Sequence, residues 1–347
     1  MGIELNIKKR YKDFLLDVSF RSDSKRIGIL GASGCGKTQT LKSAAGLVRP
    51  DDGSIALDGR VLFDKRTRTD IPPGRRDIGY LFQNYALFPN MTVEENIGAA
   101  LKGAAGSKKS HAGKTALQIM EDFDLTGLRF HYPHELSGGQ QQRTALARML
   151  ACDPKLLLLD EPFSAMDAFM REALRLELIR ILDKYDKRFI MVSHDRDEIY
   201  QLCDYLLLME GGRIIAQGPV EEIFAHPDST SAARLTGCKN ISRIERMDDH
   251  RFRAVDWNGI ELSADRRIGE EIKYAGIRAH DFTVEEGEVN VIPTGRVRIS
   301  ALPFEWYVIT ECGLWWKIPK GLKEEDARDV IPEHIRIEPD RILLMEE

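Results

Sequence analysis

Gly31-Ala-Ser-Gly-Cys-Gly-Lys-Thr38 is the stretch that decides the fold of this 347-residue chain. The apolar run Arg26-Ile-Gly-Ile-Leu30 precedes it and predicts a short buried strand, and residues 37–47 are expected to continue as a helix. A strand, a glycine loop and a helix in this order match the phosphate-loop pattern G-x-x-x-x-G-K-[ST] at every fixed position. Alternation of strands and helices around such a loop predicts an α/β sheet with ligands at the carboxyl ends of its strands.

The loop itself predicts a nucleotide site. Glycine allows the backbone to approach phosphates closely, and the N–H groups at the start of the helix attract an anion. We expect Lys37 to bridge the β- and γ-phosphates of ATP and Thr38 to ligate Mg²⁺. The alternative, a glycine-rich turn with a helical lysine, fits the flanking elements poorly. The residues expected to bind the nucleotide are Gly31, Ala32, Ser33, Gly34, Cys35, Gly36, Lys37, Thr38 and Gln39.

A second segment with candidate catalytic residues is Leu156-Leu-Leu-Leu-Asp160-Glu161. Four consecutive apolar residues are typical of a parallel strand that is buried on both faces. Asp160, at the end of this strand, is placed to hold Mg²⁺. Glu161 points elsewhere because side chains alternate along a strand, and it is the natural general base for the attacking water. The alternative is a buried strand that ends in two solvated acids.

Ser137-Gly-Gly-Gln140 lies between these two elements. A phosphate loop, this segment and the acidic strand end, in this order, resemble the ATP-binding cassette (ABC) ATPases. In that family the segment starts a helix and closes over the ATP that a second copy of the cassette holds. The resemblance implies a homodimer in which Ser137, Gly138, Gly139 and Gln140 contact the nucleotide of the partner chain.

Further residues take their roles from the same resemblance. Gln83, in Leu81-Phe-Gln-Asn-Tyr-Ala-Leu-Phe-Pro89, matches the Q-loop glutamine, which reaches Mg²⁺ and the attacking water. His194, after the apolar run 188–193, matches the switch histidine at the γ-phosphate, although a histidine at a strand end is by itself more often structural. Ser164-Ala-Met-Asp167 resembles the D-loop, which implies that Asp167 lies at the dimer interface beside the nucleotide.

Tyr11 is the best-placed candidate for stacking on adenine, with Phe14 next, since the family often places an aromatic residue there from the N-terminal strand region. Base–aromatic stacking is worth about 1–3 kcal/mol. Alternatively, Tyr11 is an ordinary aromatic side chain in a β-hairpin.

Composition narrows the class of protein. No apolar run approaches the ~18–20 residues of a membrane helix, and Met1-Gly-Ile-Glu-Leu begins a strand rather than a signal peptide. The net charge of −5 gives no support for nucleic-acid binding. The five cysteines show no metal-binding spacing and are expected to be reduced thiols in a cytoplasmic protein. They are Cys35, Cys152, Cys203, Cys238 and Cys312.

The sequence predicts two domains. Residues 1–235 would form the ATPase domain, with a helical subdomain at about 86–153 that carries Ser137–Gln140. Residues 239–347 show short strands broken by turns, which predicts a small β-barrel. Its position resembles the oligonucleotide-binding-like (TOBE-type) regulatory or dimerisation domain of many importer cassettes. Trp315 and Trp316 are adjacent in a strand and are expected on opposite faces.

The resemblance extends to a type of transporter. Residues 80–83 and 90–97 resemble bacterial importer ATPases of the maltose and molybdate/sulfate branches, and residues 57–64 and 71–79 look most like the molybdate/tungstate subgroup. This implies ATP hydrolysis for uptake at the cytoplasmic face of the membrane, with two transmembrane permease subunits and, indirectly, a substrate-binding protein. Sulfate, thiosulfate, a sugar or another small solute remain open as the substrate.

Two other classes fit the sequence less well. A soluble ABC protein that acts on nucleic acid or ribosomes usually has two cassettes, a long coiled-coil insertion or basic arms. A phosphate-loop kinase would need neither Ser137–Gln140 nor His194.

Overall fold

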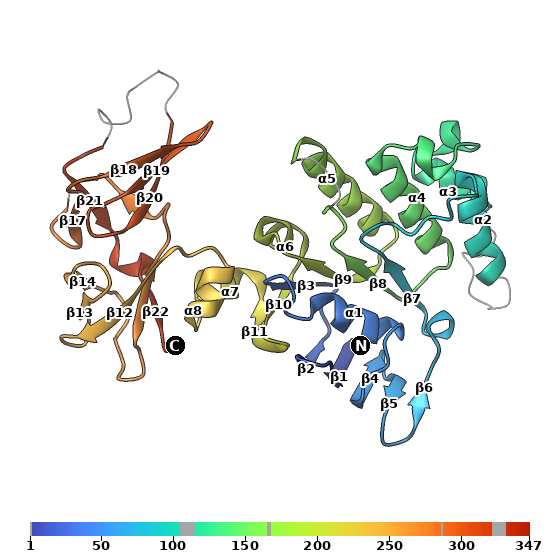
Figure 1. Ribbon diagram of the computed structural model, residues 1–347, viewed down its shortest axis with the longest axis horizontal. Helices are drawn as coiled ribbons and strands as arrows, with labels where there is room; N and C mark the ends of the chain where they lie inside the picture. The colour runs from blue at the N-terminus through green and yellow to red at the C-terminus, as the bar shows by residue number, and fades with distance from the viewer. Residues whose placement is uncertain (1, 105–114, 165–167, 286, 321–330) are drawn as a thin grey trace. The chain divides into compact units, whose positions relative to one another are not determined.

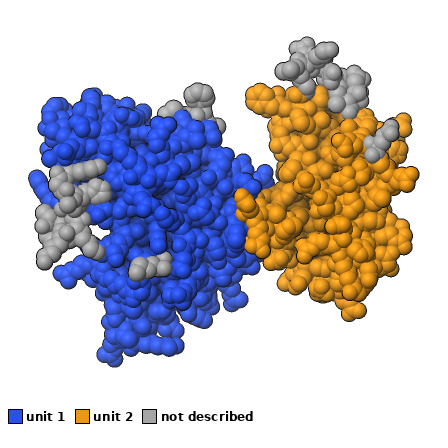
Figure 2. Space-filling model, turned by 180° about the vertical axis from the view of Figure 1, so that it is seen from behind, with its two compact units in different colours: residues 1–220 blue, residues 221–347 orange. Residues whose placement is uncertain are grey.

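The computed structural model describes residues 2–104, 115–164, 168–285, 287–320 and 331–347. The chain divides into two compact units, Met1–Val220 and Glu221–Glu347 (Figure 2). Among the described residues, no helix combines the length and the apolar character needed to cross a membrane.

The first unit is built on a six-stranded sheet in the order β11-β10-β3-β9-β8-β7. Five of these strands run parallel, and β11 pairs antiparallel with β10 at one edge. Because parallel strands end at the same edge of a sheet, the ends of β3, β8 and β9 meet there. The bounds are β3 (Arg26–Gly31), β7 (Ile78–Leu81), β8 (Leu156–Asp160), β9 (Arg188–Ser193), β10 (Tyr205–Glu210) and β11 (Arg213–Pro219).

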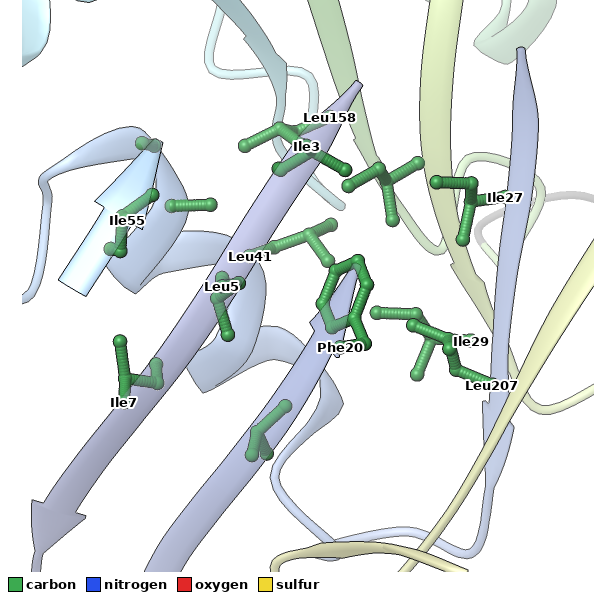
Figure 3. Close-up of a cluster of buried hydrophobic side chains, with 14 of the residues drawn as sticks. Ile3, Leu5, Ile7, Phe20, Ile27, Ile29, Leu41, Ile55, Leu158 and Leu207 are labelled. Atoms are coloured by element: carbon green, nitrogen blue, oxygen red, sulfur yellow. The ribbon is translucent and has the colours of Figure 1, made fainter. Parts of the chain in front are cut away.

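A second sheet in this unit is antiparallel, in the order β2-β1-β4-β5-β6. Residues alternate between buried and exposed along β1, and Ile3, Leu5 and Ile7 form its buried face. Figure 3 shows these side chains with Leu41 of α1 (Lys37–Ala45) and Leu207 of the parallel sheet in one apolar cluster. The phosphate-loop helix is therefore anchored by a core shared between the two sheets. The bounds are β1 (Ile3–Arg10), β2 (Leu15–Ser22), β4 (Asp52–Leu57), β5 (Arg60–Asp64) and β6 (Thr69–Asp70).

Three helices, α2 (Val93–Ala104), α3 (Ala116–Asp122) and α4 (Gly138–Ala151), pack side by side (Figure 1). The described residues between 86 and 153 contain these helices and two short 3-10 turns but no strand, and residues 105–114 of this range lie outside the description. The parallel sheet carries two more helices, α5 (Ala168–Lys184) after β8 and α6 (Arg196–Leu202) after β9.

The second unit is rich in short strands, which form three antiparallel sheets in the orders β14-β13-β12-β15-β22, β16-β21-β17 and β18-β19-β20. These small sheets agree with the predicted small β-barrel domain. The bounds are β12 (Asn240–Arg246), β13 (Arg251–Ala254), β14 (Ile260–Ser263), β15 (Tyr274–Ile277), β16 (Phe282–Thr283), β17 (Val291–Pro293), β18 (Arg298–Ala301), β19 (Glu305–Ile309), β20 (Trp315–Pro319), β21 (His334–Ile337) and β22 (Leu343–Met345).

The tryptophan pair of β20 confirms the predicted alternation. Trp316 is 4% exposed and belongs to the core of the unit, whereas Trp315 is 37% exposed. On the outer face, the Trp315 ring lies edge-on to Tyr307, and the ammonium of Lys239 lies over both rings. The alternation of side chains along β20 keeps Trp315 out of the core, and the cation–π contact with Lys239 gives its ring a partner on the outer face.

The predicted helix over 37–47 ends earlier, at Ala45, because Gly46 adopts a left-handed conformation (φ 80°) and caps the helix. In the first unit, β5 and β6 were not predicted from the sequence. The sequence also did not predict α8 (Thr230–Leu235), which groups with the second unit, as does most of α7 (Val220–Ala225). Arg278 donates hydrogen bonds to the carbonyls of Phe224 and Thr236, which ties both helices to β15. The compact units thus divide between residues 220 and 221, while the division into domains at 235–239 stays a prediction.

Candidate functional site

The glycine loop after β3 takes a conformation that its glycines require. Gly34 (φ 81°) and Gly36 (φ 105°) lie in the left-handed region, and Gly36 is the residue before the first turn of α1. A Cβ atom at Gly31 would lie 2.3 Å from the carbonyl oxygen of Met209, so the neighbouring strand excludes a side chain there. The sequence therefore folds into a narrow loop whose backbone leads directly into the N-terminus of a helix.

A cavity of about 360 Å³ lies at this loop. It brings together residues from the loop, from the turn between β1 and β2, and from the end of β8. The lining residues are Tyr11, Phe14, Ser33, Gly34, Gly36, Lys37, Thr38, Gln39 and Glu161.

The ammonium group of Lys37 lies inside the loop. Its side chain is buried, and Nζ donates hydrogen bonds to the carbonyl oxygens of Gly31 (2.7 Å) and Ala32 (3.0 Å). An ammonium group has three donors and no acceptor, so a phosphate oxygen is a natural partner for it. The buried cation and the start of α1 make this loop a site for an anion.

Asp160, at the carboxyl end of β8, is 4% exposed and accepts two hydrogen bonds. Thr38 Oγ1 donates to its Oδ1 at 2.8 Å, and the Tyr80 hydroxyl donates to its Oδ2 at 2.8 Å. Burial and the Asp160 charge raise the pKa of Tyr80 above its usual value, so its hydroxyl keeps its proton. The hydroxyl and carboxylate oxygens of Thr38 and Asp160 suit a hard cation such as Mg²⁺. Sequence reasoning predicted Thr38 and Asp160 but missed Tyr80.

Gln83 and His194, the other two residues predicted to take part in catalysis, both lie close to the Glu161 carboxylate. Its Oε2 lies 3.4 Å from Nε2 of Gln83 and 3.5 Å from Nδ1 of His194. The backbone of Glu161 is left-handed (φ 47°), which is uncommon for a residue other than glycine. Such strain clusters at functional sites because the surrounding structure must hold it. The structure thus brings Gln83, Glu161 and His194 together beside the cavity.

His194 stands on a rigid support. Ser193 Oγ donates to Glu198 Oε2 at 2.6 Å, and the Asp195 carboxylate accepts from backbone N–H groups at the start of α6. Arg175 of α5 donates to Asp195 Oδ2 (3.1 Å) and to Glu198 Oε1 (3.5 Å). Burial is the main cause that raises the pKa of Glu198. Because these hydrogen bonds hold Ser193 and Asp195, the residues on both sides of His194 are fixed, while the His194 side chain is 56% exposed.

Tyr11 lies at the wall of the cavity and is linked to the loop. Its hydroxyl donates to Gln39 Oε1 at 2.8 Å, and its ring is tilted against Phe14 with centroids 6.1 Å apart. Burial raises the pKa of Tyr11 above its usual value. Gln39 can then use its Nε2 as a donor toward the cavity. The stacking of adenine on Tyr11 stays a prediction.

Ser137 is the N-terminal cap of α4. Ser137 Oγ accepts from the N–H of Gln140 at 3.3 Å, and Gln140 Oε1 accepts from the N–H of Ser137 at 2.8 Å. This is a capping box, which a serine followed three residues later by glutamine encodes. Ser137 and Gly138 are exposed, whereas Gly139 is buried. The N-terminus of this helix therefore faces outward.

The comparisons with known proteins agree with this geometry. Residues 15–164 match the family described as "ABC transporter". The spermidine/putrescine import ATP-binding protein PotA of Roseobacter denitrificans is 38% identical over 281 residues, which are 79% of this chain and 74% of that protein. The chain belongs to the ABC transporter family. The molybdate/tungstate import ATP-binding protein WtpC of Thermococcus kodakarensis is 36% identical over 282 residues, 81% of this chain and 82% of that protein.

A solved ABC cassette shares the fold. The dimeric post-hydrolysis state of the ATP-binding cassette MJ0796, bound to ADP and phosphate, is 25% identical with a TM-score of 0.51, and the match covers 63% of this chain and 99% of that one. The chain is accordingly an ABC importer ATPase, which binds and hydrolyses ATP. One edge of the parallel sheet of this ABC protein brings together the phosphate loop, Asp160, Glu161, Gln83 and His194. Asp167, which was predicted to lie beside the nucleotide, is outside the described residues.

Proposed function

We propose that this ATPase powers an importer for an oxyanion of the molybdate or tungstate type, as a homodimer bound to two permease subunits. The observation that carries the catalytic part is the approach of Gln83 and His194 to one oxygen of Glu161, beside the cavity at the phosphate loop. A substrate-binding protein would deliver the solute to the permease, and the chain would sit peripherally at the cytoplasmic face of the membrane.

In the proposed mechanism, Lys37 and the start of α1 bind the phosphates of ATP, and Gln39 and Tyr11 hold the end that carries the base. Thr38, Asp160 and Gln83 would hold Mg²⁺, which neutralises charge on the phosphates when bound. Glu161 takes a proton from the attacking water at its carboxylate, and His194 donates toward the γ-phosphate and orients that water. The fixed neighbours of His194 keep its ring in place during this step.

The exposed start of α4 supports a composite site. The hydroxyl of Ser137 and the N–H groups that follow it are suited to a γ-phosphate, yet they face outward. A second copy of the chain, docked with its phosphate loop against this helix end, would complete each site. Asp167 is proposed to lie at the same interface.

An exposed apolar region on the helical part of the first unit supports permease docking. Phe130 is 71% exposed, and Phe88 and Tyr132 are also exposed. The backbone N–H of Val93 donates to His131 O at 2.9 Å, which places the segment with Phe130 beside the start of α2. Exposed aromatic side chains in this part of the unit are suited to contact with another protein.

Arg148 of α4 links this region to the segment after Gln83. Its guanidinium donates to the carbonyl oxygens of Tyr85 (3.1 Å) and Ala86 (2.8 Å), both left-handed in their backbone, and it lies over the Phe88 ring. If a permease displaced Phe88, the movement would therefore be transmitted through Arg148 to the segment after Gln83 and to α4, the helix that Ser137 caps.

The solute is proposed from the similarity of residues 57–64 and 71–79 to the molybdate/tungstate subgroup, and from the match to WtpC over most of both chains. The match to PotA makes a polyamine importer a second candidate, and sulfate or thiosulfate a third. Residues 1–235 are proposed as the ATPase domain and residues 239–347 as a regulatory or dimerisation domain.

The test is ATP hydrolysis by the chain reconstituted with its permease in vesicles. Binding protein loaded with molybdate, tungstate, sulfate or spermidine is added in turn, with unloaded binding protein as the control. Stimulation by molybdate and tungstate alone supports the proposal. Stimulation by spermidine or sulfate, without an effect of molybdate or tungstate, refutes the proposed solute but leaves the ATPase assignment intact.

A further inference from the structure

We infer that Tyr80 is a positioning residue of the metal site, because its hydroxyl fixes which oxygen of Asp160 faces Thr38. This inference rests on the proposed Mg²⁺ site. It assigns to a strand residue a role that neither the phosphate loop nor the acidic strand end indicates.

The geometry gives the two carboxylate oxygens of Asp160 different partners. Oδ2 accepts from the Tyr80 hydroxyl and Oδ1 accepts from Thr38 Oγ1, both at 2.8 Å. The terminal torsion of an aspartate is broad and roughly two-fold, so a carboxylate held at one oxygen can turn. With Oδ2 anchored by Tyr80, Oδ1 stays directed at the hydroxyl that is expected to ligate the metal.

The anchor comes from a neighbouring strand. Tyr80 of β7 pairs with Leu158 of β8 in parallel register, and its phenol reaches along the sheet to the carboxylate at the end of β8. The Tyr80 ring packs against Phe82 with centroids 4.5 Å apart, which restricts the ring. A hydroxyl that is held in this way on a buried carboxylate is a stronger restraint than a water molecule, because it carries no translational freedom.

The same strand leads into the segment that holds Gln83. Gln83 approaches Glu161, whereas Tyr80 binds Asp160, so β7 and the residues after it contact both acidic residues at the end of β8. A shift of this segment would therefore move the carboxylate that holds the metal together with the residue beside the general base.

The test measures metal affinity rather than turnover. Full-length Tyr80→Phe protein and the wild type are titrated with Mn²⁺ in the presence of a non-hydrolysable ATP analogue, and bound Mn²⁺ is followed by electron paramagnetic resonance. Loss of a hydrogen bond to a metal ligand typically weakens metal affinity by about 10–100-fold. We expect a loss of that size, with the affinity for the analogue in the absence of metal unchanged.

Tyr185→Phe is the matched control. Tyr185 also donates its hydroxyl to a carboxylate, Asp122 Oδ2 at 2.7 Å, but this pair involves α3 and the end of α5 and neither of its residues lines the nucleotide cavity. The control variant should bind Mn²⁺ like the wild type. In an Asp160→Ala background, Tyr80→Phe should cause no further loss, because no side-chain oxygen remains there to accept the Tyr80 hydroxyl. Tyr80→Met, which also lacks the hydroxyl, replaces Tyr80→Phe if the latter does not fold.

The outcomes separate the two claims. If the wild type binds the analogue with no saturable Mn²⁺ site, the proposed metal site itself is wrong. If the wild type has that site and removal of the Tyr80 hydroxyl leaves its Mn²⁺ affinity unchanged, the role of Tyr80 is refuted. A loss of analogue binding that is equal with and without Mn²⁺ would also refute it, since a general structural role would then explain the effect.

Discussion

Removal of the Tyr11 hydroxyl tests how the adenine end of the site is built. In Tyr11→Phe the 2.8 Å hydrogen bond to Gln39 Oε1 is lost while the ring remains. A neutral, partly buried hydrogen bond contributes about 0.5–1.5 kcal/mol, which corresponds to a loss of ATP affinity of about twofold to tenfold. Isothermal titration calorimetry of the full-length protein with ATP measures this loss.

Tyr11→Ala removes the ring as well. If adenine stacks on Tyr11, this variant should lose a further 1–3 kcal/mol or so of ATP binding free energy. Inorganic tripolyphosphate has no base, so its affinity for Tyr11→Ala should equal its affinity for Tyr11→Phe. Equal ATP affinities of the two variants would refute stacking, and wild-type ATP affinity in Tyr11→Phe would show that the bond to Gln39 does not orient the site.

The other predictions concern catalysis and stability. Glu161→Gln should bind ATP like the wild type but release phosphate about 10²–10⁴-fold more slowly, as loss of a general base does; near-normal release would remove Glu161 from this role. His194→Ala should likewise keep its ATP affinity and lose about 100-fold in turnover, and unchanged turnover would make His194 structural. Arg76 is 1% exposed and donates to two carbonyl oxygens at the end of α1, which Arg76→Met would leave unpaired, so this variant should lower the free energy of unfolding by about 1–3 kcal/mol, as measured in urea. The exposed neighbour Arg75, changed to Met, should have little effect, and equal stabilities of the two variants would contradict the argument.

The sequence predicted the parts of the site whose chemistry is local. The glycine loop and the acidic end of β8 each encode their own backbone conformation, so short patterns suffice to recognise them. Strand ends could also be placed, because long apolar runs such as Leu156–Leu159 are typical of buried parallel strands. The parallel arrangement then brings the ends together without further information.

What the sequence did not predict depends on contacts between distant segments. Tyr80 reads as an ordinary aromatic residue in a strand, and only the pairing of β7 with β8 brings it to Asp160. Arg175 lies in the middle of a helix, and its partners Asp195 and Glu198 follow a different strand. A charge in a helix is normally solvated, so a buried network of this kind leaves no local signal.

The short elements were missed for a different reason. β6 has two residues and α8 has six, which is too short for any periodic pattern to stand out. The association of α8 with the second unit depends on Arg278 and on the hydrogen bond from Thr230 N–H to the carbonyl of Glu347, which lie far from it in the sequence. A change in composition alone therefore could not locate the point where the compact units divide.

The central claim is that each ATP site contains the phosphate loop of one chain and Ser137–Gln140 of another. It is tested most directly by mixing a Ser137→Arg chain with a Lys37→Ala chain and measuring ATP hydrolysis. Every site in either homodimer has one damaged half, so both homodimers should be inactive. In the mixed dimer one site carries both lesions and the other carries none, and hydrolysis should recover to the level of one intact site. A mixture that stays as inactive as the homodimers, although subunit exchange is demonstrated, would contradict the account.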